Sequence, residues 1–275
     1  GKGCLTTPKV ETRYIKGQRF YVHTEGGTVP GVSGIKSMLP APALFNWAKN
    51  ETAWYCINNL ETIMILAEKD RAGALELVKN ATSRHSRLAA DRGTEVHALA
   101  EQIMRDKMAG VKSSFHATKD DMLYLKNLAR FIREFEVEPV FVETTVWSRE
   151  HNYAGTTDLI CRLKGYPGLS IVDYKTGASG IYSDVAVQQV GYVRADSYID
   201  EEGKFQPMPP IERAMALWLR PDGFALIPLQ TDEEVWKVFL HLREIFDYVK
   251  GTADKVVGKP VNKTPLKKTW KPPKK

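Results

Sequence analysis

The hydrophobic pattern of this chain changes its period near residue 139. Between residues 43 and 136, apolar side chains recur at intervals of about 3.6 residues, as they do along one face of a helix. From residue 139 onward they alternate every second residue, which is the pattern of half-buried strands. Three such segments follow one another, Pro139 to Trp147, Gly155 to Leu163 and Leu169 to Lys175. Helices followed by neighbouring strands and then by further helices predict an α/β fold.

The segments around these strands complete the prediction. Helices are expected over Ala43 to Lys79, Ser83 to Met108, Lys119 to Glu136 and Ser183 to Ile199. A last helix is expected after Thr231, which caps it and forms a capping box with Glu234. Short extended pieces are expected at Thr12 to Lys16 and Arg19 to His23, and Glu212 to Arg220 should form a hairpin with Phe224 to Leu229 around Asp222-Gly223. We therefore expect a central mixed β-sheet flanked by helices, plus an N-terminal helical region. Gly93 within the second helix costs roughly 1 kcal/mol relative to alanine, which indicates close approach of another segment.

Positive charge is concentrated at the end of the chain. The formal net charge is +6, and residues 251–275 hold eight lysines and one aspartate, or +7, so residues 1–250 carry about −1. This tail also contains four of the 15 prolines and few large apolar residues, which predicts disorder. We expect an N-terminal extended and helical region at 1–80 packed on a core at 81–250, followed by a basic tail at 251–275. The tail is expected to add phosphate contacts, or else to be a solvated or partner-docking extension, and Trp270 could stack there on a base.

Cysteine usage and hydropathy indicate a protein of the cytoplasm. The three cysteines, Cys4, Cys56 and Cys161, are too far apart in sequence for a disulfide framework, a zinc site or an iron-sulfur cluster. No apolar run is long enough for a membrane span, and no export signal is recognisable at the N-terminus. We therefore expect a cytoplasmic protein that contacts no membrane.

Two aspartates lie within the apolar strand segments. Asp158 interrupts Gly155 to Leu163, and Asp173 follows Ile171-Val172. A carboxylate in an apolar strand is costly unless it is paired or bound to a metal. Lys175 is two residues from Asp173, so the pleat directs both side chains to one face. Two carboxylates and a lysine on one face indicate a divalent-cation site beside a charge that can neutralise phosphate.

Structural explanations remain open for each of these residues. With 33 acidic residues in the chain, acidic-x-Lys triplets arise by chance, and Glu202-Gly203-Lys204 is another one. Asp158 and Asp173 could be turn or ion-pair residues, and a lone His97 on a helix could have a structural role. Gln188 and Tyr192 could lie on a solvated helix face. Their order along the chain is what favours a shared site.

That order resembles the PD-(D/E)XK nuclease superfamily, and specifically its RecB-like phage exonuclease branch. The motifs are Gly93-Thr94-Glu95-Val96-His97 with Glu101, Gly155-Thr156-Thr157-Asp158, Asp173-Tyr174-Lys175-Thr176-Gly177 and Gln188-Gln189-Val190-Gly191-Tyr192. The resemblance covers roughly residues 29 to 200 and implies a restriction-endonuclease-like core. Four cysteines that bind an iron-sulfur cluster in some relatives are absent, so the resemblance implies no such cluster here.

The resemblance also implies a role for each motif residue. His97, Asp158, Asp173 and the backbone carbonyl of Tyr174 would bind Mg²⁺ or Mn²⁺. Asp158, Asp173 and Lys175 would form the catalytic group, with Lys175 orienting water or offsetting charge on phosphorus. Thr176, Gln188 and Tyr192 would contact DNA, or Gln188 and Tyr192 would brace Lys175 instead. Glu143 on the preceding strand is a second-shell residue, a ligand of a second metal ion or a buried ion-pair residue.

The function expected from these motifs is metal-dependent hydrolysis of DNA from its ends. Such an exonuclease would be phage-encoded, act in the cytoplasm of a bacterial host, and serve recombination, repair or DNA processing. A single-strand annealing protein or another recombination or replication protein is a candidate partner. Two alternatives remain: a non-catalytic DNA-binding or scaffold domain on the same fold, and a sequence-specific endonuclease.

Overall fold

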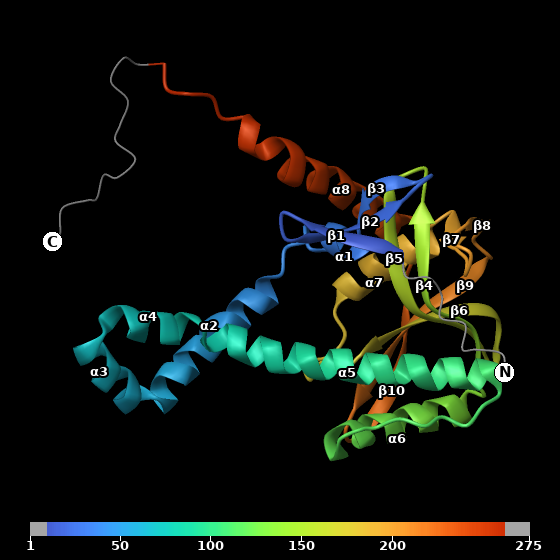
Figure 1. Cartoon of the computed structure of the whole chain (residues 1–275), viewed down its shortest axis with the longest axis horizontal. Helices are drawn as coiled ribbons and strands as arrows, with labels where there is room; N and C mark the ends of the chain where they lie inside the picture. Colours follow the sequence, from blue (N-terminus) through green and yellow to red (C-terminus); the bar gives the residue numbers. More distant parts are fainter. Residues whose placement is uncertain (1–9, 262–275) are drawn as a thin grey trace.

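The computed structural model describes residues 10–261 of the chain (Figure 1). The helices are α1 (Val32–Lys36), α2 (Pro42–Asn58), α3 (Leu60–Lys69), α4 (Arg71–Lys79), α5 (Ala81–Ala109), α6 (Lys119–Glu134), α7 (Ser183–Val193) and α8 (Glu233–Asp247). The strands are β1 (Glu11–Ile15), β2 (Gln18–His23), β3 (Gly27–Pro30), β4 (Glu138–Ser148), β5 (Tyr153–Leu163), β6 (Tyr166–Lys175), β7 (Ser197–Ile199), β8 (Phe205–Pro207), β9 (Ile211–Arg220) and β10 (Gly223–Leu229).

A seven-stranded sheet forms the centre of the molecule. Its strand order is β10-β9-β6-β5-β4-β7-β8, in which β6 and β9 run parallel and every other neighbouring pair is antiparallel. Because β6 and β9 are parallel, the chain must cross over between them, and α7 belongs to that connection. The predicted α/β fold with a mixed sheet flanked by helices is confirmed.

Helices cover both faces of this sheet, and each layer has its own apolar core. On one face α5 and α6 pack through Val96, Met104, Leu128 and Phe131. On the other face α1, α7 and α8 pack through side chains that include Ile35, Val190 and Phe239. The functional residues predicted on α5 and α7 therefore approach the strands from opposite layers.

A small sheet of β1, β2 and β3 lies against the end of β4 and β5 (Figure 1). Tyr21 and Val29 of this sheet pack on Trp147 and Ala154 of the central sheet. The extended pieces predicted near the N-terminus are therefore paired strands, and they close one end of the fold.

Helices α2, α3 and α4 form a projection that we call the helical arm, residues 42–79. It leaves the body beside the first turns of α5 (Figure 1). A single helical region was expected here, but the chain turns at Asn59 and at Asp70, whose carboxylate accepts the N–H of Gly73 at 2.9 Å. Aspartate at such a position ends one helix and caps the next.

Three local predictions were wrong. The helix expected over Ser183 to Ile199 ends at Val193, and Ser197–Ile199 instead forms β7, which pairs with Val146 and Trp147 of β4. The cap of α8 is Asp232 rather than Thr231, because its carboxylate accepts the N–H groups of Glu234 and Val235.

The third concerns the predicted tail. Helical turns continue through Tyr248–Thr252 and Ala253–Lys255, where Lys16 contacts Asp254 at 3.2 Å. The start of the tail is therefore ordered, and the tail beyond residue 261, including Trp270, lies outside the described residues. Across the described residues, no helix combines the length and the apolar character that crossing a bilayer requires.

Candidate active site

The antiparallel pairing of β5 and β6 stops at the position of two aspartates. Leu159 pairs with Val172, and the next position in the same register joins Asp158 to Asp173. The pairing of the two strands ends before this position. Asp158 Oδ2 instead accepts the backbone N–H of Tyr174 at 2.7 Å. The carboxylate thus satisfies a backbone donor that the end of the pairing would leave free.

A third acidic residue lies on β4, at the position opposite Asp158. The pairing of Val142 with Leu159 places the next residue, Glu143, opposite Asp158. Glu143 has a backbone φ of 49°, in the left-handed region that residues other than glycine rarely adopt. Three neighbouring strands therefore present a row of acidic residues, Glu143, Asp158 and Asp173, which we call the acidic row.

His97 and Lys175 flank the acidic row. His97 reaches it from α5, with Nδ1 3.6 Å from Asp158 Oδ2 and its ring edge-on to Tyr174 at a centroid separation of 5.7 Å. Lys175, at the end of β6, forms an ion pair with Oδ2 of Asp173. The four residues predicted to act together, His97, Asp158, Asp173 and Lys175, are therefore brought together by one helix and two strands.

Burial and mutual repulsion alter the ionisation of these groups. Burial raises the pKa of Asp173 above its usual range, and the charge of Asp158 adds to the shift while Lys175 opposes it. Burial, then the charges of Asp158 and Glu101, raise the pKa of Glu143 to about 7. Burial lowers the pKa of His97, but the hydrogen bond and charge of Asp158 outweigh it, so the net shift is upward. Burial is thus the largest cause of the raised pKa of both carboxyl groups, and the neighbouring carboxylates add to it.

Sequence reasoning missed the role of Arg105. Its Nε donates to Glu101 Oε1 at 2.8 Å, and its Nη2 donates to the carbonyl of Val142 at 3.1 Å. It therefore ties α5 to β4 directly before the left-handed residue Glu143. The i, i+4 spacing of Glu101 and Arg105 was the available sequence signal, but such pairs are common on helices.

Gln188 and Tyr192 lie on α7 beside the acidic row. Gln188 Nε2 donates to the hydroxyl of Tyr192 at 3.1 Å, and Tyr192 is 3% exposed. A Cβ on Gly155 would lie 2.4 Å from the Tyr192 ring, so glycine at this position is what allows the ring to sit against β5. Tyr192 is thus largely buried, and contact with DNA and bracing of Lys175 both stay predictions for this pair.

Gly93 and Thr176 meet at the margin of the site. A Cβ on Gly93 would lie 3.3 Å from Thr176 Oγ1, so the loop after β6 passes close to the backbone of α5. The close approach predicted for Gly93 is confirmed. Thr176 is half-buried, and it leads into the exposed residues Gly177, Ala178 and Ser179.

The donor set fits a divalent cation chemically, although the side chains are not arranged as a closed coordination shell. Among the described residues, no group of three or more His, Cys, Asp and Glu side chains is placed to hold a metal ion. Asp158 accepts from Tyr174 and Asp173 forms an ion pair with Lys175, but the buried Oδ2 of Asp173 accepts no hydrogen bond among the described residues. Burial, together with repulsion between the carboxylates, raises the pKa of Asp173 and Glu143, and an Mg²⁺ or Mn²⁺ ion among these groups would favour their ionised forms.

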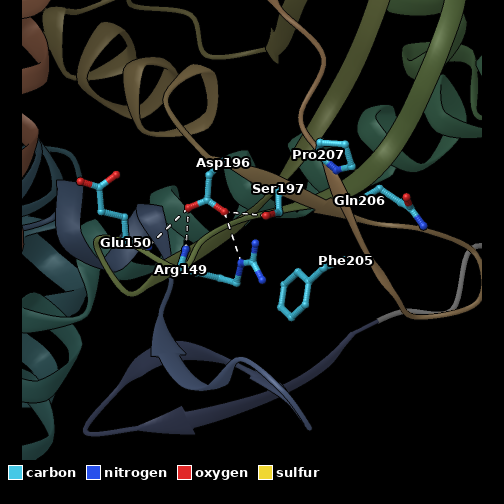
Figure 2. Close-up of a pocket in the computed structure, with 7 residues that line it drawn as sticks. All are labelled: Arg149, Glu150, Asp196, Ser197, Phe205, Gln206 and Pro207. Carbon is cyan, nitrogen blue, oxygen red and sulfur yellow. Dashed lines mark hydrogen bonds and ion pairs between the residues drawn. The ribbon is translucent and has the colours of Figure 1, made fainter.

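A separate pocket of about 650 Å³ lies at the β7–β8 edge of the sheet (Figure 2). Its lining residues are Arg149, Glu150, Asp196, Ser197, Phe205, Gln206 and Pro207. Asp196 accepts the N–H of Arg149 at 2.7 Å and also the hydroxyl of Ser197, as Figure 2 shows. Asp196 and Arg149 thus pair with each other, and no residue of the acidic row lines the pocket.

Comparison with known proteins gives this chain no relative by sequence. No protein-family model matches the chain, and no curated protein matches it. One solved structure that it matches is described as "Crystal structure of SSO0001", with a TM-score of 0.30 and 14% identity. That alignment covers 48% of this chain and 60% of the other. A similarity this weak carries no conclusion about fold or function.

Replacing Glu143 with glutamine is expected to stabilise the metal-free protein in alkaline solution. Because the folded-state pKa of Glu143 lies near 7, above the ordinary 4.5, wild-type stability falls as pH rises between these values. Glutamine cannot ionise, so Glu143→Gln should be about 1 to 2 kcal/mol more stable at pH 8, a few degrees in melting temperature. Thermal unfolding in EDTA at pH 8 and below pH 4.5 measures this difference, which should vanish in acid. The exposed Glu138→Gln on the same strand is the matched control, and a lower melting temperature for Glu143→Gln at pH 8 would contradict the expectation.

Proposed function

We propose that this protein is a metal-dependent DNA exonuclease of the RecB-like branch of the PD-(D/E)XK superfamily, with a restriction-endonuclease-like core. The observation that carries the proposal is the convergence of His97, Lys175 and the acidic row at the point where β5 and β6 separate. An aspartate pair with an adjacent lysine and a helical histidine is a set suited to phosphodiester hydrolysis.

The metal ligands in this proposal are His97, Asp158, Asp173 and the carbonyl of Tyr174. Once bound, Mg²⁺ or Mn²⁺ lowers the pKa of a water molecule and polarises the scissile phosphate. Asp158 and Asp173 supply the negative charge that attracts the cation. His97 must be neutral, because a ring nitrogen binds a metal ion through its lone pair. Cation binding therefore releases protons and strengthens as pH rises, since the pKa values of His97 and Asp173 are raised.

Lys175 supplies positive charge on the substrate side. Its side chain is 29% exposed, whereas Asp173 is 5% exposed, so the ammonium group lies between the buried carboxylate and solvent. A phosphate that approaches there meets the ammonium group, which orients water or offsets charge that develops on the phosphoryl oxygens. Thr176 contacts the DNA backbone beside it, and Gln188 and Tyr192 hold the neighbouring wall in place.

Two alternatives use the same fold. A DNA-binding or scaffold domain without activity would bind DNA and leave it intact. A sequence-specific endonuclease would cut within a duplex at fixed positions. The retention of His97, Asp158, Asp173 and Lys175 in contact favours catalysis over the first alternative.

Cleavage assays that compare DNA with free ends and DNA without ends test this function. End-labelled single-stranded and duplex DNA should be shortened progressively in Mg²⁺ or Mn²⁺ and left intact in EDTA. A covalently closed duplex circle has no ends and should survive as the control. Discrete fragments from the circle would indicate the endonuclease, and DNA binding without cleavage in either metal would indicate the scaffold.

A further inference from the structure

The helical arm exposes large apolar side chains along its whole length. Eight of them are between 55% and 65% exposed: Leu44, Phe45, Trp54, Ile57, Leu60, Met64, Ile65 and Leu75. No residue of α3 is buried. Figure 1 shows why, since the arm extends away from the sheet, and α2 and α4 meet the body beside α5. An apolar surface of this size on a protruding element marks an interaction site.

The apolar residues of the arm are spread around the helices and form no single stripe. Phe45 and Trp54 of α2 point in different directions around the helix axis, because nine residues correspond to two and a half turns. A surface helix that packs on its own domain has one apolar face, whereas a helix that is apolar on several sides is normally enclosed. Helix α5 lies against α2 and α4 at the base of the arm, so the partner that encloses the arm must cover its remaining sides.

The charge of the arm identifies the partner as protein rather than nucleic acid. Residues 42–79 contain four basic side chains (Lys49, Lys69, Arg71, Lys79) and five acidic ones (Glu51, Glu61, Glu68, Asp70, Glu76), a net charge of −1. A surface for DNA or RNA requires an excess of positive charge. A nearly neutral surface with both signs interspersed can instead meet a copy of itself without repulsion.

We propose that the arms of two copies of this chain pack against each other to form a homodimer. Eight side chains that each expose on the order of 100 Å² amount to roughly 800 Å² per copy, so two arms that wrap around each other and cover one another on several sides can bury the area that a stable protein interface needs. A twofold contact doubles every favourable pair, so one such surface is sufficient for a self-complementary dimer. This proposal does not depend on the nuclease function.

Sedimentation velocity of the full chain, from low to high micromolar concentration, tests the dimer. The wild type is expected to sediment at twice 31.0 kDa, and Met64→Glu and Ile65→Glu at 31.0 kDa. Because α3 has no buried residue, these substitutions leave the core intact, which circular dichroism and an unchanged melting temperature at low protein concentration verify. Leu123 in α6 is 46% exposed and lies outside the arm. Leu123→Glu is therefore the matched control and should remain dimeric.

A second measurement locates the contact. Amide hydrogen exchange in α3 should slow as the wild-type concentration rises, and it should not change with concentration in Ile65→Glu. A wild type that is monomeric at every concentration would overturn the proposal, whether or not another protein binds the arm. A dimer that survives both substitutions on α3 would overturn it as well.

Discussion

Methionine in place of Lys175 is expected to lower the rate of DNA cleavage by about 10³-fold while the protein stays folded. The ammonium group lies against Asp173 at the end of β6, where phosphate would approach the acidic row. Methionine keeps most of the unbranched side chain and removes its charge, so the loss measures electrostatic stabilisation rather than packing. Single-turnover cleavage of end-labelled duplex in saturating Mn²⁺ isolates the chemical step from binding.

The chain offers a matched control for this substitution. Lys204 also follows an acidic residue by two positions and pairs with Glu202 at 2.6 Å, but both side chains are about two-thirds or more exposed, at 67% and 73%. Lys204→Met should therefore cleave DNA at the wild-type rate. Wild-type cleavage by Lys175→Met, or an equal loss in both variants, would exclude Lys175 from the chemistry.

The contrast between these two triplets shows how far sequence reasoning could go. Both read acidic-x-Lys, and what distinguished them was the apolar strand around Asp173 and the loop residues around Glu202. Burial follows from that difference, since an aspartate flanked by Ile171-Val172 is carried into the sheet with its neighbours. The strand period and the motif order therefore predicted the central sheet and the convergence of His97, Asp158, Asp173 and Lys175.

The position of Glu143 beside Asp158 in the sheet could not be predicted in the same way. Its place opposite Asp158 depends on the register of β4 against β5, which shifts between Pro139 and Phe141, and a shift of one residue would turn Glu143 to the other face. The bond from Arg105 to the carbonyl of Val142 joins residues 37 positions apart. Contacts of this kind come from tertiary packing, and local periodicity holds no information about them.

Short elements were misjudged for a related reason. Ser197–Ile199 is three residues long and is a strand only because β4 offers it backbone partners at Val146 and Trp147. Its sequence continues the apolar spacing of α7, so periodicity alone extended the helix. The helical arm was misjudged as one region because two capping polar residues, Asn59 and Asp70, interrupt an otherwise helical pattern.

Asparagine in place of Asp158 is expected to change stability in opposite directions with and without metal. The charge of Asp158 raises the pKa of both Glu143 and Asp173, so its removal relieves repulsion in the metal-free protein. The amide oxygen of asparagine can still accept the N–H of Tyr174, which preserves the local backbone. In EDTA at pH 8, the variant should therefore melt at a higher temperature than the wild type.

Manganese should reverse that order. At about 100 times the dissociation constant, a bound ion stabilises the folded wild type by about 2.7 kcal/mol, whereas Asp158→Asn has lost a charged ligand and should respond little. Melting curves across a Mn²⁺ titration measure both effects, with the exposed Asp222→Asn as a control that should respond like the wild type. A variant that is merely misfolded would melt lower in both conditions. A wild type whose melting temperature is unchanged by Mn²⁺ at pH 8 would show that the acidic row binds no cation.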